Sequence, residues 1–213
     1  MSEPRVKIMP TDVQWTLASA SPRRLAILRQ VGIEPRVLPA DILEEYSGED
    51  ASELGLLNAM RKMDSIAPIV EEGIVLAADT MVLLEGRILG KPESEVEALD
   101  FLRRLRNRKH RVITAWVLSY AASGVQRSGV ESTIVSMRNM SDSEIYAYIE
   151  TGSPMDKAGA YGIQGAAAAF VDSIEGCYFN VVGLPISRVL TEASILLNPT
   201  SPVTAGGEDA IHG

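Results

Sequence analysis

Apolar and polar residues follow two spacings along the chain, and these spacings predict strands and helices in alternation. Continuous or alternating apolar runs predict strands, whereas apolar residues three and four positions apart predict helices. Strands are expected at residues 15–18, 36–38, 74–78, 112–120, 132–137, 168–174 and 178–182, and residues 81–84 and 87–89 are expected to form a hairpin. Helices are expected at residues 22–31, 51–67, 95–105, 142–151 and 185–197. This order indicates an α/β protein with a mixed sheet.

Capping residues mark where several helices begin. Ser21 is a favourable N-cap, and the proline after it suits the first helical position. Ser94 with Glu97, and Ser141 with Glu144, have the spacing of a capping box. These signals support the helix boundaries that the apolar spacing predicts.

Length and local composition divide the chain into three parts. Residues 1–14 are expected to be an N-terminal extension, and residues 15–197 a single α/β domain long enough to bury a core. Residues 198–213 are rich in proline, threonine, serine and glycine, which predicts a disordered tail.

Charge and cysteine content limit the classes of function. The net charge of −8 argues against nonspecific binding to nucleic acid or to an anionic membrane. No apolar run is long enough to span a membrane, and the first 14 residues lack the apolar stretch of a signal peptide. Cys177 is the only cysteine, which excludes an intrachain disulfide and fits a reducing cytoplasm. We expect its thiol to be buried and inert.

Asp79 is the first candidate for chemistry, because it directly follows the apolar run at 74–78. Ligands of open α/β sheets bind beyond the carboxyl ends of such strands. Lys91, in a loop bounded by Gly90 and Pro92, is expected nearby, where a carboxylate and a lysine could hold a metal and an anionic substrate together. The alternative is that Asp79 only caps a turn.

The segment from Ser19 to Arg24 is the second candidate. A helix N-terminus offers free N–H groups and partial positive charge, to which the Ser19 hydroxyl and the Arg23 guanidinium add donors suited to phosphate. The alternative is an ordinary capped helix with solvated arginines. The sequence has neither a Walker A motif nor a dinucleotide fingerprint.

Other polar residues support or exclude particular reactions. Glu44 and Asp79 are candidate partners for Mg²⁺, which takes one or two carboxylates and completes its shell with water and phosphate, although Glu44 lies in a run of acids typical of a solvated surface. A serine triad is disfavoured, since only His110 and His212 could serve it. The basic residues around His110 are interpreted as complementing a helix dipole, rather than as a nucleic-acid patch.

Residues 156–165 form a glycine-rich segment that can bring its backbone close to a ligand. Gln164 carries a donor and an acceptor, which suits recognition of a nucleotide base edge. A tight surface turn is the alternative.

Five short segments together resemble the Maf family of nucleoside triphosphate pyrophosphatases, over roughly residues 16–193. They are Ala-Ser-Ala-Ser-Pro-Arg-Arg at 18–24, Ala-Asp-Thr at 78–80, Leu-Gly-Lys-Pro at 89–92, the segment 156–165, and Asn-Val-Val-Gly-Leu-Pro at 180–185, in the order of the family. The resemblance implies an elongated mixed β-sheet with flanking helices and two lobes around a central cleft, a Maf/ITPase-like fold. Family members are often dimeric, so a homodimer is an expected assembly.

The resemblance also implies an activity. Members hydrolyse nucleoside triphosphates between the α and β phosphates with a divalent cation, here expected to be Mg²⁺ or Mn²⁺. By resemblance, Asp79 is the general base. Arg23, Thr80 and Gln164 correspond to positions linked to substrate choice, and Glu44, Lys62 and Lys91 to other polar positions of the cleft. The cation is expected on Asp79, aided by Glu44.

The segment 156–165 looks like the branch of the family that acts on dTTP and UTP. The 7-methyl-GTP branch is one alternative, and a nucleotide-binding regulator of septum formation is another. The chain departs from the family pattern at Met60, where many members have arginine, at Asn107, where a glycine is common, and in the plain alanines 166–169. Asparagine tolerates left-handed geometry, so we expect the turn at Asn107 to form.

Overall fold

The computed structural model describes residues 13–46, 48 and 50–198. The strands are β1 (Trp15–Leu17), β2 (Arg36–Val37), β3 (Ile74–Leu84), β4 (Arg87–Leu89), β5 (Lys109–Tyr120), β6 (Gln126–Met137) and β7 (Val171–Glu175). The helices are α1 (Pro22–Gln30), α2 (Ala51–Ile66), α3 (Glu95–Leu105), α4 (Asp142–Ile149), α5 (Tyr178–Val182) and α6 (Ile186–Leu197), with 3₁₀ helices at Ala67–Ile69, Ser153–Asp156, Ala158–Ala160 and Ala166–Phe170. The expected extension, apart from its last two residues, and the expected tail, apart from Asn198, lie outside the described residues.

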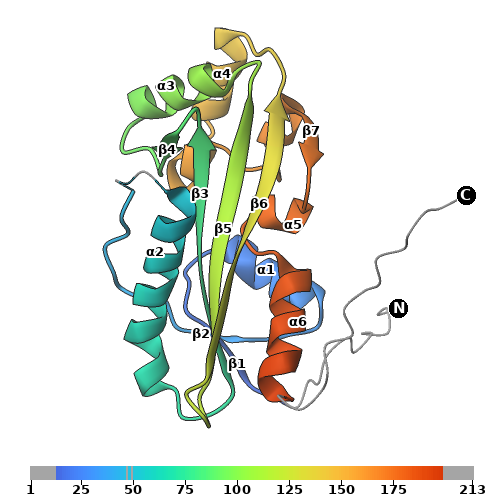
Figure 1. Ribbon diagram of the computed structural model, residues 1–213. Helices are drawn as coiled ribbons and strands as arrows, with labels where there is room; N and C mark the ends of the chain where they lie inside the picture. Colours follow the sequence, from blue (N-terminus) through green and yellow to red (C-terminus); the bar gives the residue numbers. More distant parts are fainter. Residues whose placement is uncertain (1–12, 47, 49, 199–213) are drawn as a thin grey trace, which may run out of the picture.

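Seven strands form one mixed sheet in the order β2-β1-β3-β5-β6-β7, and β4 pairs with the carboxyl end of β3 (Figure 1). Strand β1 runs parallel to β2 and β3, whereas all other neighbours are antiparallel. Strands β3, β5 and β6 have 11, 12 and 12 residues, so they give the sheet its elongated shape. The α/β fold with a mixed sheet and flanking helices that the sequence predicts is confirmed.

Helices cover both faces of this sheet. Successive side chains of a strand point to opposite faces. Val75 and Ala77 of β3 pack against α2, whereas Ile74 and Leu76 pack with α1 and α6. The run at 74–78 is therefore buried on both sides, which explains why it shows no polar alternation.

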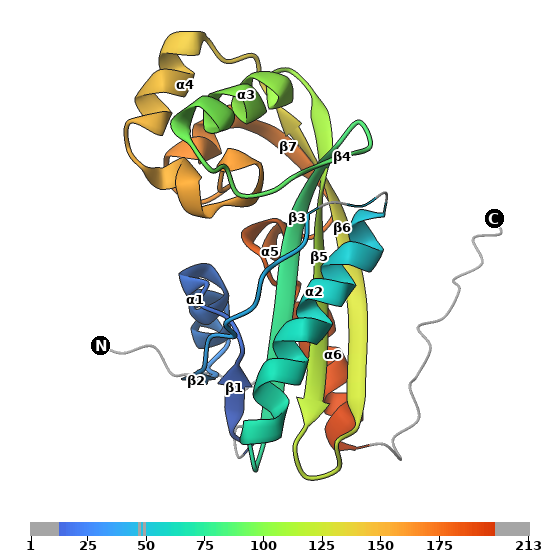
Figure 2. The ribbon, with the colours of Figure 1, turned by 90° about the vertical axis from the view of Figure 1, so that its left-hand side faces the viewer.

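A second apolar core lies at the other end of the long strands. It joins Val82 of β3 and Val112 of β5 to α3 and α4. Figure 2 shows α3, α4 and β4 at one end and α1 and α6 at the other, with β3 and β5 running through both. We call these ends the α3/α4 lobe and the α1/α6 lobe.

The edge of β3 is open between the two lobes. Strand β1 pairs with β3 only as far as Leu76, and β4 pairs with it only from Val82. Within the described part of the chain, residues 78–81 have no strand on this side. Side chains and ligands can therefore approach the middle of β3 from its edge.

The structure corrects the expected end of β3. The strand does not stop at Asp79 but continues to Leu84, because β5 pairs with it from Ile74 to Leu83. What ends near Asp79 is the parallel pairing with β1. Asp79 therefore lies in the middle of a strand and does not cap a turn.

The expected strand at 178–182 is wrong, because these residues form helix α5. The Asn180 side chain donates to Val112 O and to Thr133 Oγ1, both at 2.9 Å, which ties this helical turn to the sheet. Gly183 then ends the helix with a φ of 124°. A short apolar run has no periodicity that distinguishes a strand from a buried helical turn.

Several smaller expectations have mixed outcomes. Ser141 and Glu144 form the predicted capping box, whereas the Glu97 carboxylate accepts from Glu93 N instead of Ser94 N. Asn107 adopts the expected left-handed conformation, whereas Cys177 is half-buried instead of buried. In the part of the chain that the structure describes, none of the helices combines the length and apolar character needed to span a bilayer.

Candidate active site

A cleft of about 430 Å³ lies between the two lobes, beside the open edge of β3. This volume lies within the usual range for small-molecule sites. Its polar lining consists of Ser19, Ser21, Arg23, Arg24, Glu44, Tyr46, Lys62, Asp79, Thr80, Lys91, Asp156, Lys157, Tyr161 and Gln164. The fold thus gathers groups that are far apart in the sequence.

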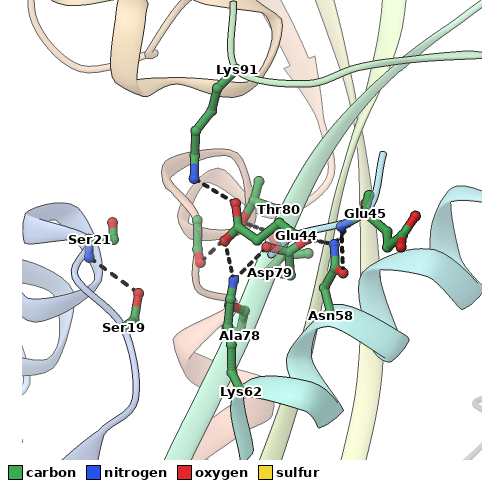
Figure 3. A network of polar contacts seen from close by, with 12 residues as sticks. Ser19, Ser21, Glu44, Glu45, Asn58, Lys62, Ala78, Asp79, Thr80 and Lys91 are labelled. Atoms are coloured by element: carbon green, nitrogen blue, oxygen red, sulfur yellow. Dashed lines mark hydrogen bonds and ion pairs between the residues drawn. The ribbon is translucent and has the colours of Figure 1, made fainter. Parts of the chain in front are cut away.

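Lys62 of α2 joins the two carboxylates of the cleft (Figure 3). Its Nζ lies 2.7 Å from Asp79 Oδ1 and 2.6 Å from Glu44 Oε1. It also donates to Ala78 O over 3.2 Å, at the open edge of β3. The Lys62 and Asp79 side chains are only 7% and 4% exposed, so this ion pair is shielded from water. The contacts fix the direction of the Asp79 carboxylate.

Asn58, one turn before Lys62 on α2, holds the second oxygen of Asp79. Its Nδ2 donates to Asp79 Oδ2 over 3.1 Å and to Glu45 O over 2.9 Å, while Asn58 Oδ1 accepts from Glu45 N over 2.9 Å. Asn58 therefore ties the loop that carries Glu44 to the strand that carries Asp79.

Glu44 is less buried than Asp79 but has more donors. Its Oε2 accepts from Tyr46 Oη at 2.5 Å and from Lys91 Nζ at 2.7 Å, in addition to the Lys62 contact at Oε1. Burial alone would raise the pKa of Glu44, but the charge of Lys62 and the hydrogen bonds from Lys62, Lys91 and Tyr46 hold it well below its usual value. Glu44 is therefore an anion at neutral pH.

Arg24 links the first helix to the floor of the cleft. Its Nε donates to Gly183 O, its Nη1 to Ser19 Oγ and its Nη2 to Thr80 Oγ1, each at 2.9 Å. Burial lowers the pKa of Arg24, while the negative charge of Asp79 acts in the opposite direction. The buried cation thus fixes the Ser19 and Thr80 hydroxyls in relation to Asp79.

Two ion pairs cross the cleft between the lobes. Arg23 of α1 donates to Asp156 Oδ2 over 2.9 Å, and Lys91 reaches Glu44 over 2.7 Å. Asp156 also pairs with its neighbour Lys157. The cations that could bind a polyphosphate are therefore paired with carboxylates in the protein alone.

The segment 156–165 lines the α3/α4 side of the cleft. Gln164, whose side chain is exposed, belongs to this lining. Three residues of the segment have positive φ: Gly159 at 67°, Ala160 at 60° and Gly165 at 79°. The segment contains the 3₁₀ helix Ala158–Ala160, and its residues 161–165 are irregular and lead into the 3₁₀ helix Ala166–Phe170, so it is longer than a single tight turn.

Comparison with known proteins agrees with this arrangement. The family model described as "Maf-like protein" matches residues 14–194. The chain belongs to the Maf family. A dTTP/UTP pyrophosphatase of Carboxydothermus hydrogenoformans is 44% identical to this Maf-like protein over 83% of its chain and 95% of the relative. One from Syntrophomonas wolfei is 45% identical over 81% and 92%.

Among solved structures, the Ham1 protein of Staphylococcus aureus matches this Maf-like chain with a TM-score of 0.41 and 16% identity. The match covers 58% of this chain and 71% of the other. A likeness this distant carries no functional information.

Every site residue predicted from the Maf resemblance lies on the cleft. Four of them, Asp79, Lys62, Glu44 and Lys91, are joined by ion pairs, and Gln164 lines the cleft outside this group. The sequence analysis did not single out Asn58, nor the contribution of Arg24 to fixing the Ser19 and Thr80 hydroxyls. The Pro-Arg-Arg sequence at a helix start was a signal for Arg24. Nothing in the apolar spacing of α2 distinguishes Asn58 from the other polar residues of that helix.

The carboxylates offer a partial site for a divalent cation. In the described part of the chain, no three His, Cys, Asp or Glu side chains are grouped as metal ligands. Asp79 Oδ1 and Oδ2 and Glu44 Oε1 each accept one protein hydrogen bond, and a carboxylate oxygen has two lone pairs. These oxygens fit Mg²⁺ or Mn²⁺ if phosphate oxygens of a substrate complete the shell.

Proposed function

We propose that this Maf-like protein is a nucleoside triphosphate pyrophosphatase that hydrolyses dTTP and UTP to the monophosphate and pyrophosphate. The observation that carries the proposal is the buried Asp79 carboxylate, fixed by Lys62 and Asn58 on a cleft lined with cations. Relatives named dTTP/UTP pyrophosphatase, 42–45% identical over most of the chain, support the choice of substrate.

In this proposal Asp79 acts as a general base. It accepts a proton from the water that attacks the α-phosphorus, and the bond to the bridging oxygen breaks, so that pyrophosphate leaves. Asp79 can accept the proton on a lone pair that neither Lys62 nor Asn58 occupies. Positioning and charge neutralisation supply most of the catalysis in phosphoryl chemistry, and they are what a rigidly held carboxylate among cations provides.

The polyphosphate is bound by the cationic side of the cleft. Arg23 and Lys91 exchange their carboxylate partners for phosphate oxygens, and the partial positive charge at the start of α1 attracts the anion. The Arg23 guanidinium can donate two parallel hydrogen bonds to one phosphate. Because Arg23 and Lys91 come from opposite lobes, they bracket the substrate.

The nucleoside lies toward the segment 156–165. Gln164 presents a donor and an acceptor to the base edge, and Thr80, which also lines the cleft, accepts a hydrogen bond from Arg24. A divalent cation, when bound, would neutralise phosphate charge, and Asp79 and Glu44 are the residues that would hold it. We further propose a cytoplasmic location, which agrees with the single cysteine of the sequence.

A panel of nucleoside triphosphates with Mg²⁺ or Mn²⁺ tests this function. We expect release of pyrophosphate, with dTTP and UTP preferred. Release of orthophosphate would reject the reaction type, and preference for 7-methyl-GTP or another purine would reject the branch. Binding without turnover would favour a regulatory role.

A further inference from the structure

His110 and Tyr161 form a buried pair of side chains that takes no part in the proposed reaction. His110 Nε2 lies 2.6 Å from Tyr161 Oη, and the two rings meet edge to face with centroids 5.3 Å apart. His110, near the start of β5, is 3% exposed, and Tyr161 is 5% exposed. The hydrogen bond therefore joins the central sheet to the segment 156–165.

This segment needs external support for its conformation. Ala160, directly before Tyr161, has a φ of 60°, which is unfavourable for any residue with a Cβ. The preceding residue is tied by a backbone hydrogen bond from Gly159 N to Gly90 O at 2.9 Å. The Tyr161 side chain supplies a second tie, from the other side of the strained position.

Tyr161 is also close in sequence to Gln164, which the proposed function places at the nucleotide base, and to Lys157. It lines the cleft together with Lys157 and Gln164, which lie four positions before it and three after it. A displacement of Tyr161 would move both of these side chains relative to the α1/α6 lobe.

Both side chains of the pair are neutral, so their hydrogen bond orients the segment 156–165 without adding charge. Burial lowers the pKa of His110 to about 4, and burial likewise raises the pKa of Tyr161. His110 Nδ1 is buried and has no hydrogen-bond partner among the described residues. Burying such an atom costs free energy. Two apolar side chains of similar shape would avoid that cost but would lack the directional bond.

We propose that His110 is a positioning residue for nucleotide recognition, acting through the hydroxyl of Tyr161 to hold the segment 156–165 against the cleft. The inference rests on the proposed function, because it assigns the held segment to the nucleoside part of the substrate. It predicts an effect on substrate binding and base preference, with little effect on the chemical step at Asp79.

The test compares Tyr161→Phe with Tyr120→Phe in the full-length protein. Tyr120 ends β5 at the opposite end of the strand, so the control removes the same hydroxyl far from the cleft. For Tyr161→Phe we expect KM for dTTP to rise roughly fivefold to tenfold, the range for one lost directional hydrogen bond. We expect kcat to stay within about twofold, and the preference for dTTP over GTP to fall.

Two further variants separate positioning from general destabilisation. Gln can place its Nε2 near that of histidine, so His110→Gln should keep KM close to the wild-type value. His110→Phe should raise KM as Tyr161→Phe does, and the double variant should be no worse than either single variant. Additive effects, or an equal KM in Tyr161→Phe and Tyr120→Phe, would overturn the inference.

A binding measurement keeps this test separate from the test of function. The dissociation constant of a dTTP analogue with a methylene bridge between the α and β phosphates is measured by calorimetry for each variant. If the wild-type protein binds the analogue without hydrolysing any triphosphate, the proposed function fails, yet weaker binding by Tyr161→Phe alone would still support the inference. If the wild type neither binds the analogue nor hydrolyses dTTP, both fail.

Discussion

Lys62 Nζ lies 2.7 Å from Asp79 Oδ1, and this contact is the most shielded ion pair of the cleft. Lys62 also contacts Glu44, so one ammonium lies between two carboxylates. The ammonium offsets the repulsion between the two carboxylates. The two acids can therefore lie close together on the cleft.

Removal of Lys62 should destabilise the protein much more than removal of Lys91. Lys62→Met leaves the buried Asp79 carboxylate and the half-buried Glu44 carboxylate without their shared cation, and breaking a buried pair costs about 3–5 kcal/mol. Lys91 is half exposed, so Lys91→Met should change the free energy of unfolding by no more than about 1 kcal/mol. Urea denaturation of both variants measures the difference. Equal stability of the two variants would contradict the buried ion pair.

Asp79→Asn should remove catalysis and leave the fold intact. The amide keeps the size of the side chain but cannot take a proton from water, so we expect kcat for dTTP to fall about 10²-fold to 10⁴-fold. Lys62 keeps its partner Glu44 in this variant, which limits the loss of stability. Asp64→Asn, an exposed acid on α2, is the control and should have normal turnover. Turnover near the wild-type level in Asp79→Asn excludes Asp79 as the base.

Asp156→Asn should strengthen nucleotide binding. Asp156 pairs with Arg23 at the mouth of the cleft, where a triphosphate competes for the same guanidinium. The pair is largely exposed, so its loss should lower KM only about twofold to fivefold, with a smaller effect at high salt. Asp142→Asn removes a comparable ion pair with Arg103, away from the cleft, and should leave KM unchanged. A higher KM in Asp156→Asn would indicate that Asp156 helps substrate binding instead.

His110 should make the protein less stable as the pH falls from about 6.5 to 4. The unfolded imidazole takes a proton near pH 6.5, whereas burial lowers the pKa in the folded state to about 4. Between these values the unfolded state binds more protons, so stability falls with pH and then levels off. Urea denaturation at pH 7 and pH 4.5 should show a smaller loss for His110→Gln than for the wild type. An identical loss of stability in the two proteins would show that a group other than His110 causes the pH dependence.

Removal of divalent cations should abolish turnover without unfolding the protein. Among the described residues, two carboxylates, Asp79 and Glu44, are grouped in the cleft, and phosphate oxygens are needed to complete a coordination shell, so the fold does not depend on the ion. Dialysis against EDTA should leave the circular dichroism spectrum and melting temperature unchanged while dTTP hydrolysis stops. Added Mg²⁺ or Mn²⁺ should restore hydrolysis. Full activity after chelation would contradict a metal-dependent reaction.

The parts of the fold that the sequence predicts correctly depend on local signals. Ser21 and Ser141 accept hydrogen bonds from the first turns of α1 and α4, as their spacing indicates. The run at 74–78 is buried on both faces, as its uniform apolarity indicates. Helix boundaries and buried strands are therefore predictable here from neighbouring residues alone.

The wrong predictions involve contacts with distant residues. Strand β3 continues past Asp79 because β5 pairs with it, and the strand cannot reveal this partner in its own sequence. Residues 178–182 are helical because Asn180 bonds to β5 and β6. The same limit applies to the cleft, since Asn58 becomes important only when α2 lies beside β3.

The continuity of β3 and β5 through both lobes restricts how the protein can move. Two lobes joined by a linker can rotate as rigid bodies about a hinge, as in many enzymes that close on a nucleotide. Here a hinge would have to break the ladder that runs from Ile74 opposite Tyr120 to Leu83 opposite Arg111. Admission and release of a ligand are therefore left to the loops around a stiff central sheet, and the turnover rate should follow the mobility of those loops.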